Sequence, residues 1–263
     1  LRRDAMENFS KSGFPTIADE DWRYTNVSSV ATTTYDTPPK ASSAAVVQTD
    51  ALAHVEALEG PRCFFLNGRF CPELSQLEDL DTQIQVRPLG KILQERPDEV
   101  EPYLGHYLTI GDHPFATLNT AFIEEGAVVR VAKGSQIRKP IHLVFVSVAD
   151  SGNAFVTHPR NLIVVGESSQ CAVVEHYLGV ADGPYFPNPV TELVVEENAN
   201  VEHYRIQVEG PSAQHVSALH IEQAANSTVR TMGADLGGKL TRNDLNLVLG
   251  GQGAEASLDG IFI

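Results

Sequence analysis

The fold is decided by two copies of one tetrapeptide, Val174-Glu175-His176-Tyr177 and Val201-Glu202-His203-Tyr204, which stand twenty-seven residues apart. Similar short apolar stretches lie on either side of them, and each is followed by a small polar turn rather than by a helix. A repeat of this length is typical of stacked units, none of which buries its apolar face alone. The sequence therefore predicts a mainly β protein whose residues 127–263 form a parallel β-helix, or β-solenoid.

A smaller mixed α/β region, residues 1–110, is expected before the repeats. The Asn67-Gly68 pair between apolar residues predicts a β-hairpin there. Residues 111–126 predict a helix, since Phe115, Leu118 and Phe122 fall on one face. A solenoid needs a cap over the apolar end of its stack, and this helix is expected to supply it.

Composition excludes several classes of function. The 263 residues include 34 acidic and 19 basic ones, for a net charge of −15, which disfavours nucleic acid and anionic membrane as partners. The sequence has no run of eighteen apolar residues, and its first residues, which lack an apolar core segment, are not expected to be a secretory signal. An odd number of cysteines, 3, is typical of reduced thiols, so a cytoplasmic location is expected.

The two ends of the sequence suggest a partial chain. Residues 259–263 have the pattern of the middle of a strand, and an uncapped last coil would expose a free strand edge. We therefore expect the natural protein to continue past Ile263. Position 1 is Leu rather than Met, which favours a clipped or partial chain.

The two Glu–His pairs are the strongest chemical candidates. If the tetrapeptides stack in register, Glu175 lies beside Glu202 and His176 beside His203, and Cys171 could add a thiolate. Carboxylate, imidazole and thiolate ligands suit iron or zinc. However, successive residues of a strand point to opposite faces, so each face would hold a stacked His pair or a stacked Glu pair. The alternative interpretation is a polar ladder on a solvated face, with Glu–His contacts across coils.

Two glycine-rich segments resemble nucleotide-binding loops. Residues 233–239 have the spacing of a phosphate-binding loop, but Leu240 stands where a Ser or Thr is needed and a strand follows instead of a helix. Residues 251–256 match a relaxed dinucleotide fingerprint at a place where every coil turns. Turns between coils are the favoured interpretation of both. Trp22 and Arg23 are expected to form a stacked anchor that joins the N-terminal segment to the solenoid.

Several segments together resemble the SufB/SufD family, the scaffold subunits of the SUF iron–sulfur cluster assembly system. They are Glu20-Asp21-Trp22-Arg23-Tyr24-Thr25-Asn26, residues 118–122, residues 159–165 leading to Glu175-His176-Tyr177, and the coil after His215. The similarity runs through nearly the whole chain, and the N-terminus fits the SufD branch better than the SufB branch.

The resemblance implies a right-handed parallel β-helix and a non-catalytic scaffold that acts with SufB and the ATPase SufC. An iron–sulfur cluster would be assembled transiently in that complex, with a homodimer as a further arrangement of the isolated subunit. A bacterial cytoplasm fits, as does a plastid stroma for a plant or algal source. In the family, the SufC-binding surface and the interface histidine follow in segments beyond Ile263, so no functional residue of the family can be placed on this sequence.

Two alternatives from other classes stay open. A β-helix enzyme or metal-binding protein would use the Glu and His residues on adjacent coils, and a nucleotide-binding protein would use residues 233–239.

Overall fold

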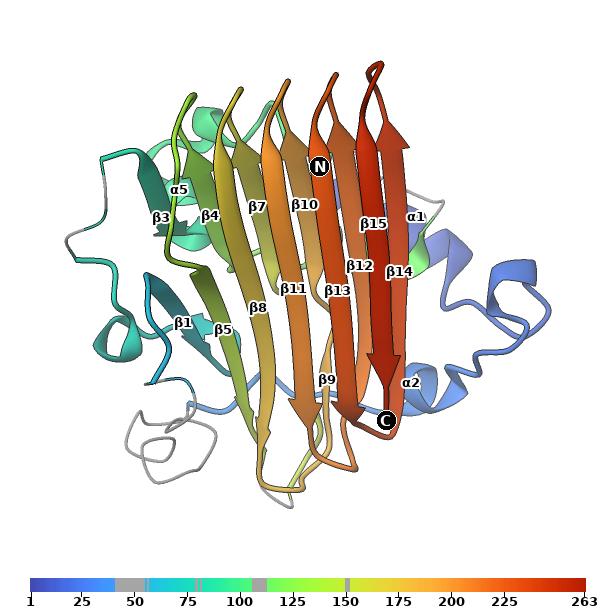
Figure 1. Cartoon of the computed structure of the whole chain (residues 1–263). Coiled ribbons are helices and arrows are strands. Elements are labelled where there is room, and N and C mark those ends of the chain that lie inside the picture. The colour runs from blue at the N-terminus through green and yellow to red at the C-terminus, as the bar shows by residue number, and fades with distance from the viewer. Residues whose placement is uncertain (41–54, 56, 79, 81, 106–112, 150–151) are drawn as a thin grey trace.

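A computed structural model describes the chain except for residues 41–54, 56, 79, 81, 106–112 and 150–151. Two sheets face each other and are crossed alternately by the chain, so that each strand bonds to the equivalent strands of the coils on either side (Figure 1). In one sheet this parallel pairing continues from coil to coil through the strands that begin at residues 141, 170, 200, 228 and 255. The predicted β-solenoid is thereby confirmed.

We call the two layers the front sheet and the back sheet. The front sheet has the order β15 (Glu255–Phe262), β13 (Thr228–Gly237), β11 (Asn200–Glu209), β8 (Gln170–Val180), β5 (Ile141–Val148), β1 (Arg62–Leu66) and β2 (Arg69–Phe70). The back sheet has the order β14 (Leu240–Leu249), β12 (Gln214–Gln223), β10 (Val190–Val195), β7 (Arg160–Val165), β4 (Ala127–Val131) and β3 (Ile84–Pro88). A short pair, β6 (Phe155–Thr157) and β9 (Tyr185–Pro187), lies at one edge.

One corner of the solenoid repeats the same turn in every coil. A residue with positive φ stands there each time, between 54° and 75°, and the five residues are Gly134, Ser168, Asn198, Asn226 and Gly253. The main-chain N–H of each of the first four donates to a carbonyl in the turn of the next coil, at 2.8–3.0 Å. Gly and Asn tolerate this left-handed conformation, which explains why the sequence has small polar residues at these turns.

The space between the sheets has a dry half and a polar half. Beside the turn corner, apolar side chains from both sheets form the main core, among them Val129, Ile163, Val173, Leu193 and Val201. Farther along the same strands the inward positions carry Asn, Glu, Tyr, His, Arg and Asp side chains that are nearly all buried. The apolar half holds the two sheets together. The polar half contains most of the buried acidic, basic and imidazole side chains, which are the residue types found in functional sites.

The N-terminal region contributes strands to both sheets. The chain turns from β1 to β2 through Asn67 and Gly68, whose φ angles are 46° and 73°, so the predicted hairpin is confirmed. In the back sheet β3 pairs antiparallel with β4. The end of the stack next to β4 and β5 is therefore occupied by β1, β2 and β3.

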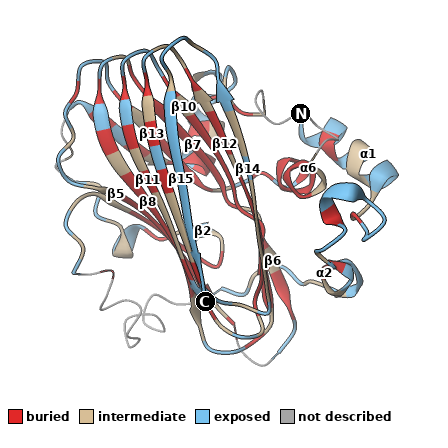
Figure 2. Cartoon of the chain, turned by 45° about the vertical axis from the view of Figure 1, so that its right-hand side comes forward, coloured by how far each residue is buried: buried red, intermediate tan, exposed pale blue. Residues whose placement is uncertain are grey.

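The predicted capping helix is present but shorter and differently placed. Its first two residues, 111 and 112, lie outside the described residues, and the helix α6 runs over Pro114–Ala121. Ala116 packs against Val190 and Ala218, so α6 covers the outer face of the back sheet and not the end of the stack (Figure 2). This placement differs from the expected end cap because β1–β3 already occupy that end.

A buried ion pair fixes α6 to the solenoid. The guanidinium of Arg160 on β7 pairs with the carboxylate of Glu192 on β10 at 2.5 Å, and both side chains are fully buried. The same guanidinium donates to the Asn119 and Thr120 side chains of α6, at 3.2 Å each. Taking away one member of such a pair would leave a buried charge without its partner.

The remaining helices lie outside the two sheets. Within the described residues they are α1 (Arg2–Ser12), η1 (Glu20–Trp22), α2 (Ser28–Thr32), η2 (Pro72–Leu74), α5 (Leu89–Glu95) and η3 (Pro97–Glu99). Helix α1 packs along α6, and α5 covers the outer face of β4 and β7 through Leu89 and Ile92. In the described part of the chain, no helix has the length and apolar character needed to cross a bilayer.

Candidate functional site

Strand register decides where the two Glu–His pairs lie. Strands β8 and β11 pair residues thirty positions apart, such as Cys171 with Val201, whereas the tetrapeptides repeat after twenty-seven. Glu175 is therefore opposite Arg205, and His176 is opposite Ile206. The tetrapeptides do not stack in register, so the condition for Glu175 to lie beside Glu202 and His176 beside His203 is not met.

The offset of three residues is odd, so the two copies present opposite faces. Glu175 and His203 both point between the sheets, whereas His176 and Glu202 point to the outer face of the front sheet. The statement that one face holds only a stacked His pair or a stacked Glu pair is thus wrong, because an acid and an imidazole now share the interior. A Glu–His contact across coils does form, but it is buried instead of solvated.

The carboxylate of Glu175 is surrounded by donors inside the solenoid. Its Oε1 accepts hydrogen bonds from Thr191 Oγ1 at 2.8 Å and from His203 Nε2 at 2.9 Å. Its Oε2 accepts from Tyr177 Oη at 2.6 Å and from Asn161 Nδ2 at 3.3 Å. Four donors from four strands satisfy both oxygens, which is how a buried carboxylate stays ionised.

The pKa of Glu175 reflects this competition. Burial alone would raise it, because the charged form loses its hydration. The hydrogen bond and the electrostatic interaction with His203, followed by the bonds from Tyr177 and Thr191, outweigh burial and hold the pKa of Glu175 below its ordinary value. On the far side of the imidazole, His203 Nδ1 lies 2.9 Å from Thr231 Oγ1. We call these residues the Glu175 network: Asn161, Glu175, Tyr177, Thr191, His203 and Thr231.

A second network crosses the interior one coil farther on. Arg205 on β11 pairs with Asp235 on β13, with Nη1 2.9 Å from Oδ1. Asn243 on β14 donates to Asp235 Oδ2 at 2.7 Å, and Ser217 on β12 donates to Asn243 Oδ1 at 2.5 Å. This chain of contacts links the front sheet to the back sheet. Nearby, Glu209 Oε2 lies 2.8 Å from His215 Nδ1, and both side chains are buried.

The other predicted metal residues lie apart from the Glu175 network. His176 on the outer face contacts His142, with Nε2 3.0 Å from His142 Nδ1. Glu202 accepts a hydrogen bond from Tyr204 Oη at 3.1 Å. Cys171 belongs to the dry core, where burial raises the pKa of its thiol to about 12. Among the residues that the structure describes, no three His, Cys, Asp or Glu side chains converge on a point that could hold a metal ion.

The sequence reasoning missed most partners of the Glu175 network. Asn161, Thr191 and Thr231 come from three different strands and give no local motif. The only available indication is that each is a polar residue at a buried position of a strand that also carries buried apolar residues. Such a position requires a hydrogen-bond partner once the strand is buried.

The glycine-rich segment 233–239 does not form a phosphate-binding loop. Residues up to Gly237 belong to strand β13, and β14 follows from Leu240, so no helix N-terminus faces this segment. Gly233 lies beside Arg205, whose Nη2 would be 2.9 Å from a β-carbon at this position. Residues 251–256 include the turn between β14 and β15, as the favoured interpretation expected.

The N-terminal anchor is formed, but with a different arginine. Trp22 is 5% exposed and its ring centroid lies 5.1 Å from that of Phe115. The guanidinium over its face, 3.7 Å from the ring centroid, belongs to Arg242 on β14. Arg23 instead forms an exposed ion pair with Glu20 at 3.0 Å. The anchor thus joins the N-terminal segment to the solenoid as expected, through a residue 220 positions away in the chain.

Two models of known protein families together match nearly the whole chain. Residues 1–143 match the family model described as SufBD protein N-terminal region. Residues 146–263 match the one described as SUF system FeS cluster assembly, SufBD core domain. The two matches meet inside the solenoid, in the middle of β5.

Named relatives agree with these matches. The chain is 30% identical, over 94% of its length, to the iron–sulfur cluster assembly SufBD family protein slr0076 of Synechocystis. It is 23% identical over 94% of its length to protein ABCI7, chloroplastic, of Arabidopsis thaliana, and 22% identical over 97% to iron–sulfur cluster assembly protein SufD of Escherichia coli. It covers 55%, 52% and 57% of these three proteins, so it spans about half the length of the relatives it matches.

Proposed function

The chain belongs to the SufBD family, whose members take part in iron–sulfur cluster assembly, and from this premise we propose that it acts as a non-catalytic scaffold. Its partners would be a SufB-like subunit and a SufC-like ATPase. The cluster would be cargo assembled transiently in the complex. A cytoplasmic or plastid location is part of the same proposal.

The burial of the reactive side chains is the observation that carries the proposal. Glu175, His203 and Cys171 are each at most 3% exposed, and every oxygen of Glu175 is already engaged. A catalytic acid, base or nucleophile has to reach its substrate. The outer face of the front sheet, in contrast, is formed by the long parallel strands β8, β11, β13 and β15 (Figure 1), which suits the docking of other proteins.

Metal binding by the Glu–His residues has less support. A metal ion at Glu175 would have to displace donors that hold the carboxylate, and His203 is occupied on both ring nitrogens. His176 and Glu202 lie on the other face of the sheet, so a site that includes all five predicted ligands would need a different strand register.

A co-expression pull-down tests the scaffold proposal. The gene product that contains this chain would be tagged and co-expressed with the SufB-like and SufC-like proteins of the same source, and a chain of residues 1–263 would be tested beside it. We expect the gene product to co-purify with both partners. Failure to retain either one, with all three proteins soluble, would overturn the proposal.

A further inference from the structure

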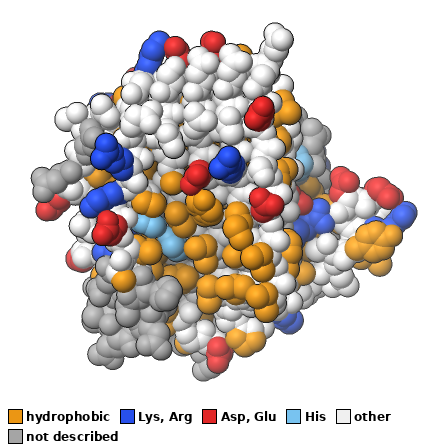
Figure 3. Space-filling model, viewed as in Figure 1, with side chains coloured by type: hydrophobic (Ala, Val, Ile, Leu, Met, Phe, Trp, Pro, Cys, Tyr) orange, Lys and Arg blue, Asp and Glu red, His pale blue; other side chains and the backbone are white. Residues whose placement is uncertain are grey.

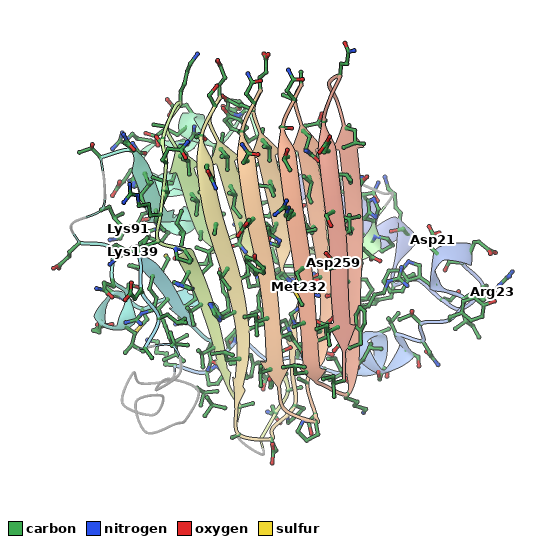
Figure 4. All side chains as sticks on the ribbon, viewed as in Figure 1. Asp21, Arg23, Lys91, Lys139, Met232 and Asp259 are labelled. Carbon is green, nitrogen blue, oxygen red and sulfur yellow. The ribbon has the colours of Figure 1, made fainter. Side chains whose placement is uncertain are left out.

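A short segment projects from the side of the solenoid. We call residues 16–26 the N-terminal knuckle. In Figure 1 it lies beyond β14, away from the strands, between α1 and α2. Figure 4 places Asp21 and Arg23 on it, with Arg23 at the tip and directed away from both sheets.

The knuckle is held firmly at its base. Arg242 stacks on Trp22, and its Nη1 donates to the main-chain oxygen of Asp21 at 2.9 Å and to Thr25 Oγ1 at 3.1 Å. At the start of the knuckle, Asp19 Oδ2 accepts hydrogen bonds from Thr16 N at 2.7 Å and from Thr16 Oγ1 at 3.1 Å. Since the backbone on both sides of Trp22 is fixed, little conformational entropy remains to be lost when a partner binds.

Tyr24 stands in this fixed segment with its ring in solvent. It is 94% exposed, more than any other large hydrophobic side chain among the described residues, and Ile17 on the same knuckle is 60% exposed. A space-filling view shows hydrophobic side chains at the projecting tip, next to charged ones (Figure 3). A tyrosine so exposed contributes nothing to the core, and tyrosine is among the residues most enriched at binding hot spots.

The charge around Tyr24 indicates what kind of surface it fits. The knuckle carries three acids, Asp19, Glu20 and Asp21, against one base, Arg23. Arg23 is already paired with Glu20. The remaining negative charge favours a partner with basic residues at the rim of its site.

We propose that the N-terminal knuckle is a docking surface for a protein whose surface has an apolar recess rimmed by lysine or arginine, with the Tyr24 ring as the anchor in that recess. The proposed function supplies the two proteins used as probes, a SufB-like subunit and a SufC-like ATPase. The surface itself is inferred from the fixed base, the exposed ring and the local charge.

The test measures the affinity of the gene product that contains this chain for its purified SufB-like and SufC-like partners. Tyr24→Ala should weaken binding to one of them about 10- to 30-fold, the loss expected for a hot-spot residue. Tyr24→Phe keeps the ring and should stay within about threefold of the unaltered protein. Met6→Ala, on the exposed side of α1, is the matched control and should leave binding unchanged.

Two further measurements keep the outcomes separate. A photo-reactive phenylalanine analogue at position 24 should cross-link to a partner segment that contains Lys or Arg beside apolar residues. A cross-link to another part of the same chain would overturn the proposal, and so would a lower melting temperature for Tyr24→Ala, since the ring would then serve the fold.

Binding by Tyr24→Ala as tight as that of the unaltered protein overturns the knuckle as a docking surface and leaves the scaffold function standing. Absence of any binding by the unaltered protein overturns the scaffold function itself, and with it the docking of these two partners.

Discussion

His203 Nε2 lies 2.9 Å from Glu175 Oε1, although His203 is paired in the sheet with Val173 and not with Glu175. The contact is diagonal, between inward positions two residues apart on neighbouring strands. The contact lies at the boundary between the apolar half and the polar half of the interior, next to Val173 and Val201 of the core. We therefore expect it to stabilise the polar half.

Replacing Glu175 by Gln should destabilise the protein strongly. The substitution keeps the size of the side chain but removes the charge and one acceptor from a fully buried network. We expect the free energy of unfolding to fall by about 2–4 kcal/mol. Denaturant unfolding followed by circular dichroism measures the change. Glu202→Gln, on the outer face, is the control and should stay within about 0.5 kcal/mol; equal effects of the two variants would contradict this account of the interior.

Acid should weaken the fold through the same carboxylate. The pKa of Glu175 is lower in the folded protein than its ordinary value of 4.5, so the folded state favours the ionised form. The resulting stability is present above the unfolded pKa and is lost as pH falls through the folded pKa. The difference in unfolding free energy between the unaltered protein and Glu175→Gln should be constant from pH 7 to about pH 5 and shrink below it. A difference in unfolding free energy that grew on acidification would contradict the lowered pKa of Glu175 in the folded protein.

Loss of Arg242 should release the N-terminal segment without unfolding the solenoid. Arg242→Ala removes the stack on Trp22 and two hydrogen bonds to the knuckle. We expect about 1–2 kcal/mol lower stability and faster hydrogen exchange in residues 16–32. Arg230→Ala, on β13, is the matched arginine control. Unchanged exchange in residues 16–32 would argue that Trp22 is held by Phe115 and its neighbours alone.

Gly126 should not accept a side chain. Its φ is 147°, and a β-carbon there would lie 1.9 Å from the main-chain oxygen of Arg160. Gly126→Ala is expected to cost at least about 3 kcal/mol, because both the conformation and the contact are forbidden. Gly134 also has positive φ, 72°, but nothing within 4 Å of the added carbon, so Gly134→Ala should cost only about 1 kcal/mol. Thermal unfolding of the two variants tests the ranking.

The three thiols should be unreactive in the folded protein. Cys63, Cys71 and Cys171 are all buried, and burial raises the pKa of each thiol, that of Cys171 to about 12. Only the thiolate reacts with alkylating or disulfide reagents. A thiol titration at pH 8 should therefore detect fewer than about one thiol per chain before denaturation, and all of them after it. Rapid labelling of Cys171 in the folded state would reopen a sulfur-accepting role for it.

Local features of the fold could be predicted, and the pairing between coils could not. The Asn67-Gly68 hairpin and the turns at Ser168, Asn198 and Asn226 follow from residues that tolerate positive φ. Strand register depends on the length of the whole coil, which changes from coil to coil. The tetrapeptide repeats after twenty-seven residues, whereas the strands pair residues thirty positions apart. His203 therefore points between the sheets and His176 points outward, and the tetrapeptide itself does not encode this difference.

The same limit applied to the anchor and to the interior networks. Trp22 could be recognised as a buried anchor, yet its partner Arg242 is distant in sequence and was not distinguishable from other arginines. Arg160, Asn119 and Glu192 likewise come from separate elements. Contacts of this kind depend on which helices and strands pack together in the folded protein, and the local sequence does not specify that packing.

The repeated turn corner also determines where this protein can be altered. Each coil is bonded there to the coils beside it, so one extra residue at Asn198 would break main-chain bonds to two neighbours at once. The opposite edge already accommodates connections of unequal length, such as residues 181–184 and residues 238–239. An epitope or fluorescent peptide is therefore best inserted in the connection 181–184. Immobilising the protein through its turn corner would attach every coil on the same side of the solenoid.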